Sequence, residues 1–279
     1  MGKVPAYLQY ALYVVVLLAV IEFLFVIVSK RRSRDKRETT ANFSIWLINQ
    51  FIKPVIIGGV FLAVLVPVSK WAPYTLPVTG WTMFLTLIVA DFVYYWNHRI
   101  SHQVRLFWTY HSVHHSSPEY NLSTAIRLPW IGLVGDTMFY IPLVLVGFNP
   151  VLLSFAKSIV LLAQAWIHTE AIGKLGWFDK VFNSPSNHRV HHGSNGVYLD
   201  KNHGGILIIW DRLFGTYQEE LITEPVIYGL TKPINSYNPW TINFHETGVM
   251  FKEVRGAKSF KEALGYVFKG PGWSPSTMR

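Results

Sequence analysis

Apolar residues form five long runs within the first 170 residues, and this pattern predicts membrane helices. A helix needs about 20 predominantly apolar residues to span a bilayer. The second and third runs are short, so a re-entrant or half-spanning helix is the alternative for either. The first is expected to be a retained anchor, because no small-residue cleavage site follows it. The runs extend over residues 7–28, 54–68, 81–96, 130–148 and 151–167.

The pattern changes after these runs to short mixed segments with Gly and Pro breaks, which predict a cap of mainly short helices. Near the chain end, Ser259 and Glu262 form a capping box before an amphipathic helix. This helix either lies on anionic lipid or packs on the cap. The predicted fold is all-α: a bundle of about four to five membrane helices within 1–170, and a cytosolic helical cap, 171–279.

Composition and charge support a multi-pass membrane protein. Hydrophobic residues make up 51% of the chain and charged residues only 15%, against about 25% charged residues in soluble domains. Six Lys and Arg residues lie within 30–37, directly after the first run. The positive-inside rule places them in the cytoplasm, whereas the loop with only Lys70 and the uncharged turn 147–150 belong outside. The protein is predicted in a bacterial inner membrane or the endoplasmic reticulum, with segment 97–129 and the cap on the cytoplasmic side.

Several function classes lack support. The net charge of +9 fits an anionic membrane surface, and because the basic residues concentrate at the membrane boundary, nucleic acid is not expected as a partner. The sequence has no Gly-rich nucleotide loop, nucleophile elbow, haem attachment motif or flavin fold. Any redox chemistry therefore needs electrons from a redox partner protein or a diffusible reductant.

Histidines are the most informative residues. Eight of the 11 fall into three short windows. Residues three or four apart share one face of a helix, so each window directs two or three imidazoles to one point and predicts a metal site. The windows are HRISH, HSVHH and HRVHH, with His98, His102, His111, His114, His115, His188, His191 and His192.

The number of histidines indicates two metal ions, because a zinc ion takes only three or four protein ligands. The chain has no cysteine and no H-E-x-x-H motif. An all-nitrogen dinuclear site points to iron and oxygen chemistry, although ligand type alone leaves zinc or manganese open. All three windows fall on the cytoplasmic side of the predicted topology.

Four ionisable residues in the apolar runs are further candidates. His168 ends the fifth run at the same membrane boundary and joins the predicted site. Asp91 lies seven residues before His98 on the same helical face, so we expect it to pair with a ligand histidine or with an arginine such as Arg127. Lys157 is expected to extend outward to water, and Asp136 to line a pocket.

Four segments resemble the fatty acid hydroxylase and sterol desaturase superfamily of integral-membrane non-haem diiron oxygenases. Residues 121–127 and 200–216 are most similar to its alkylglycerol monooxygenase branch and bacterial relatives. The resemblance implies membrane helices capped by a cytosolic helical domain, with two irons between them. The segments are DFVYYWNHRISH, HSVHHSSPEYNLSTAIR, SPSNHRVHHG and DKNHGGILIIWDRLFGTY, and they cover most of residues 91–218.

The resemblance implies that the eight clustered histidines and His168 are metal ligands. Relatives with a tenth histidine carry it four residues before the His168 position, where this chain has Gln164. The Gln164 amide would bind metal, hold a water or do neither. Relatives of the closest branch usually have tyrosine at the position of His203, which makes this histidine a candidate extra ligand or a neighbour of one. His245 lies outside every window and is expected at the surface.

The sequence therefore predicts an O2-dependent oxidoreductase with two iron ions that hydroxylates, desaturates or oxidatively cleaves an alkyl chain. The predicted substrate is a lipid such as a fatty acid, a sterol or an ether lipid. The alternatives are a membrane zinc hydrolase and a non-catalytic metal-binding membrane protein. Transport is disfavoured, because the ligands collect on one side instead of along a path across the bilayer.

Overall fold

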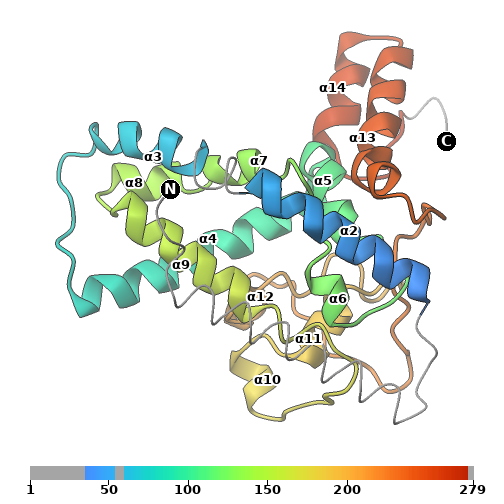
Figure 1. Ribbon diagram of the computed structural model, residues 1–279, viewed down its shortest axis with the longest axis horizontal. Helices are drawn as coiled ribbons and strands as arrows, with labels where there is room; N and C mark the ends of the chain where they lie inside the picture. The colour runs from blue at the N-terminus through green and yellow to red at the C-terminus, as the bar shows by residue number, and fades with distance from the viewer. Residues whose placement is uncertain (1–34, 54–59, 276–279) are drawn as a thin grey trace.

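The computed structural model describes residues 35–53 and 60–275 (Figure 1). The first apolar run, residues 7–28, lies outside them, as do residues 54–59 of the second. Within the described residues there is no β-strand, only two isolated backbone bridges. The predicted all-α class is therefore confirmed.

The helices are α2 (Lys36–Lys53), α3 (Leu62–Ser69), α4 (Gly80–Gln103), α5 (Arg105–His115), α6 (Leu122–Ala125), α7 (Leu133–Met138), α8 (Ile141–Leu145), α9 (Pro150–Ala163), α10 (Phe178–Val181), α11 (Pro185–His191), α12 (Ile209–Leu213), α13 (Pro239–Gly256) and α14 (Phe260–Phe268). Among these helices, none combines the length and apolar character needed to cross a membrane.

The long helix α4 is the central element, packing against both α9 and α5 (Figure 1). It begins at a capping box, where the Thr79 hydroxyl accepts from the Thr82 amide at 3.2 Å. The third apolar run and the first histidine window form one continuous helix. At Val104 the backbone becomes extended for a single residue, and α5 begins at once. This sharp connection brings the second histidine window back against the first.

The fourth apolar run was predicted as one helix, and this prediction is wrong. The run is divided between α7 and α8, with Pro142 in the first turn of α8. Proline has no amide hydrogen and its ring clashes with the preceding turn, so it favours a helix start over a helix interior. The predicted turn at 147–150 is present, and the Asn149 side chain caps α9 through the amides of Val151 and Leu152.

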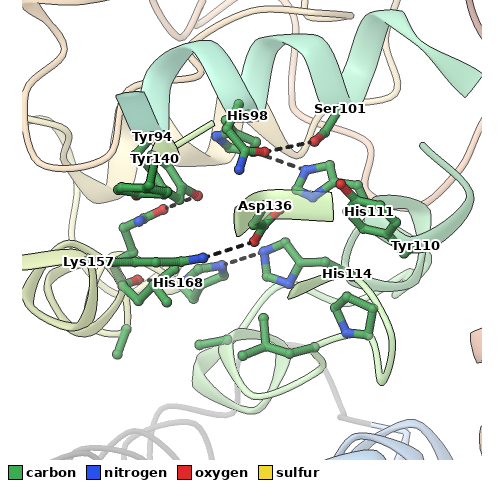
Figure 2. A pocket seen from close by; sticks show the side chains of 18 residues that line it. Tyr94, His98, Ser101, Tyr110, His111, His114, Asp136, Tyr140, Lys157 and His168 are labelled. Atoms are coloured by element: carbon green, nitrogen blue, oxygen red, sulfur yellow. Dashed lines mark hydrogen bonds and ion pairs between the residues drawn. The ribbon is translucent and has the colours of Figure 1, made fainter. Parts of the chain in front are cut away.

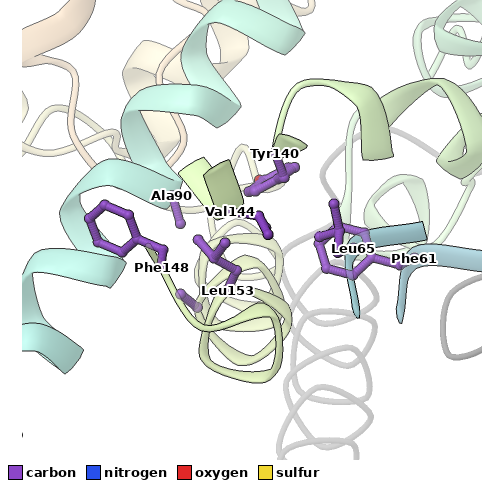
Figure 3. Close-up of a cluster of buried hydrophobic side chains, with 8 residues drawn as sticks. Phe61, Leu65, Ala90, Tyr140, Val144, Phe148 and Leu153 are labelled. Carbon is purple, nitrogen blue, oxygen red and sulfur yellow. The ribbon is translucent and has the colours of Figure 1, made fainter. Parts of the chain in front are cut away.

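The main apolar core lies where α3, α8 and α9 meet α4 (Figure 3). Tyr140, Val144 and Leu153 are fully buried in it. A second cluster joins α2, α5 and α13 through Ile45, Val113 and neighbouring side chains. The two clusters fix the helices that carry the first two histidine windows.

The predicted capping box is present only in part, because the Glu262 carboxylate accepts from the amide of Lys258 at 3.1 Å and not from that of Ser259. The Ser259 hydroxyl accepts from the Glu262 amide at 3.2 Å and begins α14. α14 packs on α13 and α5 and buries Tyr266. The side chains of Phe260 and Phe268 are exposed by 79% and 56%. One face of α14 therefore packs on the protein, and its opposite apolar face is free of it.

Candidate metal centre

The first two windows face each other across the α4–α5 connection. His98 and His102 are one turn apart near the end of α4, and His111 and His115 are one turn apart on α5. The ring centroids of His98 and His111 are 4.7 Å apart, as are those of His102 and His115. The four-residue spacing thus produces two facing pairs, as the sequence predicted.

The third window comes from the short helix α11. The Ser184 hydroxyl accepts from the Asn187 amide, and Pro185 occupies the first turn. His188 lies on this helix, followed by His191 and His192 at its end. The helix places these three rings against the α4–α5 pair.

Nine histidines gather into two groups whose ring nitrogens could each hold a metal ion. Within each group, the candidate ligand atoms all lie within 4.8 Å of one another. The larger group consists of His98, His102, His111, His115 and His191, and the smaller group of His114, His168, His188 and His192. His168, which came from a separate part of the sequence, belongs to the smaller group.

The distances between ring nitrogens fit metal coordination. The Nε2 atoms of His98 and His111 are 3.0 Å apart, and those of His168 and His188 are 3.1 Å apart. Two nitrogens about 2.1 Å from an ion and at right angles to each other would be about 3.0 Å apart. Buried Nε2 atoms of His102, His191 and His192 have no hydrogen-bond partner in the described structure. A bound ion would satisfy these atoms.

Backbone carbonyls fix the orientation of several rings. His98 Nδ1–H donates to the His203 carbonyl and His168 Nδ1–H to the Gln164 carbonyl, both at 2.8 Å. His191 Nδ1–H likewise donates to Lys201 at 3.0 Å. These bonds select the tautomer in which Nε2 carries the free lone pair, which is how ligand histidines are oriented around metals.

Burial keeps the imidazoles neutral. It lowers the pKa of His114 to about 4, and it holds the pKa values of His191 and His192 well below the usual range. A protonated ring cannot bind a metal, so neutral rings near pH 7 are the form that the site requires.

Three further candidates occupy specific places. His203 is fully buried and belongs to neither group, but its ring centroid is 5.0 Å from that of His102. Its Nδ1 lies 3.6 Å from a carboxylate oxygen of Asp211, and its carbonyl orients His98. Gln164 uses its carbonyl for His168, while its side-chain oxygen accepts from Tyr94 at 2.9 Å. His245 is exposed on α13.

Asp91 has neither of the partners expected from the sequence. Its carboxylate accepts from the amides of Ile206 and Leu207 and from the Trp210 indole, at 2.6, 3.1 and 2.9 Å. These bonds attach α12 and the loop before it to α4. Because the same loop includes His203, Asp91 acts on the candidate centre through the backbone and not through a ring.

Sequence reasoning missed two polar contacts of the site. The Asp200 carboxylate lies 3.3 Å from His102 Nδ1, although no spacing linked the two residues. Lys157 was expected to extend outward, but its side chain is buried and forms an ion pair with Asp136 at 3.4 Å. The prediction for Lys157 was wrong, and the prediction that Asp136 lines a pocket is confirmed.

A pocket of about 170 Å³ adjoins both histidine groups (Figure 2). This volume is far above the roughly 10–15 Å³ that a single water needs. His98 and His111 of the larger group and His114 and His168 of the smaller group contribute to its wall. Much of the remaining wall is apolar, so the pocket suits a hydrocarbon segment beside the candidate metal positions.

Residues 83–216 match the fatty acid hydroxylase family. This segment belongs to that family. The match includes all nine grouped histidines and His203, and the resemblance inferred from the histidine windows is confirmed.

Curated relatives agree with the fatty acid hydroxylase match. Human alkylglycerol monooxygenase is 43% identical over 199 residues, covering 71% of this chain and 44% of the relative. The Caenorhabditis elegans alkylglycerol monooxygenase is 36% identical over 234 residues, covering 78% and 45%. Ornithine lipid hydroxylase OlsE of Rhizobium tropici is 30% identical over 138 residues, covering 48% and 40%. The chain thus spans less than half the length of these relatives. No solved structure matches it.

Proposed function

We propose that this chain is a membrane-bound diiron oxygenase that uses O2 to hydroxylate, desaturate or oxidatively cleave an alkyl chain of a lipid. The observation that carries the proposal is the pocket whose wall includes histidines from both groups. A substrate carbon in that pocket would lie beside both metal positions. The similarity to an alkylglycerol monooxygenase and an ornithine lipid hydroxylase supports a lipid substrate.

In this proposal the larger histidine group holds one iron and the smaller group holds the other. Imidazole is a suitable ligand for iron. The two ions would supply the reduction of O2, with electrons from a redox partner protein or a diffusible reductant. The contribution of the chain is to hold neutral rings in place through the carbonyls of Lys201, His203 and Gln164, and to keep the alkyl chain against the apolar part of the pocket wall.

Exposed apolar side chains support contact with a membrane. Phe43, Leu47 and Phe51 lie one turn apart on α2 and are exposed by 48%, 55% and 75%. A stripe of this kind is costly in water and favourable against lipid. A lipid could then pass from the membrane into the pocket.

Metal content should reach about two ions per chain in protein reconstituted anaerobically with Fe²⁺, because nine histidines exceed the needs of one ion. Mass spectrometry measures the metal and amino-acid analysis measures the protein, and together they give the number of ions per chain. Full activity at a ratio near one would contradict the dinuclear assignment.

The reaction itself is tested by comparing cells with and without the protein by lipid mass spectrometry. The oxygenase proposal predicts lipid species that gain one oxygen or lose two hydrogens. The oxygen gained should carry the label when ¹⁸O2 is supplied. A zinc hydrolase would instead act without O2 and incorporate oxygen from water. Label from water with unchanged activity under nitrogen would replace the proposal with this alternative.

The proposed orientation is tested by cysteine labelling, since the natural chain contains no cysteine. A cysteine at position 75 should react with an impermeant thiol reagent added outside the cell, whereas cysteines at 35 and 196 should be protected until the membrane is opened. The physical reason is the basic segment 30–37, which favours the cytoplasmic side. The reverse labelling pattern would place the histidine groups on the outer side.

A further inference from the structure

Within the pocket wall, Lys157 and Asp136 are the only Lys, Arg, Asp or Glu side chains. They join α9 to α7 through a contact of 3.4 Å between Nζ and a carboxylate oxygen. The Lys157 side chain is only 7% exposed and that of Asp136 is 22% exposed. An ion pair here is costly to bury, and the pair lies outside both histidine groups.

The surroundings of Lys157 leave part of its hydrogen-bonding capacity unused. A lysine ammonium has three donors, and the hydrogen bonds of the described structure use one of them, to Asp136. Its nitrogen otherwise faces the rings of Phe61 and Tyr140, at 5.1 and 5.2 Å from their centroids. The Tyr140 hydroxyl is itself buried in the pocket wall and has no hydrogen-bond partner in the described structure.

We propose that Lys157 and Tyr140 donate hydrogen bonds to a neutral oxygen group on the lipid, such as a hydroxyl, ether or carbonyl, while Asp136 balances the charge of Lys157. This inference rests on the proposed function and names the substrate class of the same pocket. Figure 2 shows the ion pair reaching into the pocket that His114 and His168 also line. A lipid oxygen bound at this ion pair would hold the lipid in one position. That position would determine which carbon of the alkyl chain lies beside the histidine groups and is oxidised.

Charge decides which oxygen group fits. Because Lys157 is already paired with Asp136, the two side chains are neutral together. A fatty acid carboxylate placed there would be repelled by Asp136, whereas a neutral oxygen can accept a spare hydrogen from Lys157 or from the Tyr140 hydroxyl. The apolar part of the wall, including Leu128, Pro129 and Leu161, would contact the hydrocarbon chain.

The test is equilibrium binding to the full metal-loaded chain under anaerobic conditions, where no turnover occurs. Tritiated hexadecylglycerol is the probe, and unlabelled hexadecane and palmitate, with the same number of chain carbons, are the competitors. The natural protein should bind hexadecylglycerol about tenfold more tightly than either competitor. Equal affinities for the three ligands would overturn the inference.

Two variants locate the selectivity. Lys157→Met should weaken hexadecylglycerol binding about tenfold and leave hexadecane within about twofold. Lys174→Met is the matched control, because Lys174 pairs with Glu219 at the exposed surface, and it should change neither affinity. Tyr140→Phe removes a hydroxyl that has no hydrogen-bond partner in the described structure, so this variant should fold normally. Its preference for hexadecylglycerol over hexadecane should nevertheless fall severalfold. Unchanged selectivity in Tyr140→Phe and in folded Lys157→Met would overturn the inference.

The inference and the proposed function fail in different ways. Selective binding of hexadecylglycerol without any hydroxylated, desaturated or cleaved product would support the inference and contradict the oxygenase proposal. Equal oxidation of hexadecylglycerol and hexadecane, with binding insensitive to both variants, would leave the oxygenase proposal intact and overturn the inference.

Discussion

Replacing either His191 or His192 with alanine should reduce turnover below about 1% of the natural protein and lower the bound metal by about one ion per chain. The two residues are neighbours in sequence, but His191 belongs to the larger histidine group and His192 to the smaller. Under the diiron proposal, each substitution therefore removes a ligand from a different ion. Changes to groups that merely orient a ligand already cost about 10- to 100-fold in affinity or activity.

Metal analysis and product formation on the same preparation measure both effects. His245→Ala is the control, because His245 is exposed on α13, and it should stay within about twofold for both quantities. If His192→Ala kept two ions and full turnover, the smaller group would not be a metal site. If His245→Ala lowered turnover and metal content as much as the other two substitutions, the two histidine groups would not contain every histidine that the site needs.

Replacing Arg127 with methionine should destabilise the fold by about 3–5 kcal/mol, the range for breaking a buried ion pair. The Arg127 side chain is 1% exposed and donates to Glu38 at 2.5 Å and to Asn42 at 2.9 Å on α2. It also donates to the Val113 carbonyl of α5 at 2.9 Å. Methionine fills similar space but leaves Glu38, itself 2% exposed, as an unpaired buried charge.

Thermal unfolding in detergent, followed by circular dichroism, measures this loss. Lys174→Met again serves as the control, since its ion pair with Glu219 is exposed and such pairs contribute little. The backbone carbonyl of Arg127 accepts from His114 Nδ1 at 3.3 Å. Because loss of the Arg127 side-chain contacts should loosen this backbone, Arg127→Met should also lower metal retention. An unchanged melting temperature would mean that α2 is held by its apolar contacts alone.

The convergence of the histidines could be predicted because it depends on local geometry. Residues four apart in a helix share a face wherever that helix lies, so His98 with His102 and His111 with His115 had to form pairs. Their division into two groups could not be predicted. His114 and His115 are adjacent but point to different groups, and that outcome depends on how α11 and His168 approach them.

Long-range partners were the main failure of sequence reasoning. Asp91 was correctly placed on the face of α4 that carries His98, but its partners lie 115 to 119 residues later, in α12 and the loop before it. Lys157 lies in an apolar run, where snorkelling toward water is the ordinary expectation. The structure instead provides Asp136 as a partner from α7. No periodicity in one segment carries information about a carboxylate supplied by another.

The stacking of His115 on His192, with ring centroids 4.4 Å apart, couples the two groups mechanically. Helix α5 supplies rings to both groups, and so do α11 and the residue that ends it. If each group holds an ion, as proposed, the first ion would order both segments and so lower the entropy cost of ordering them around the second ion. Binding at one group would then favour binding at the other, and chains of the natural protein holding a single ion would be fewer than independent sites would give.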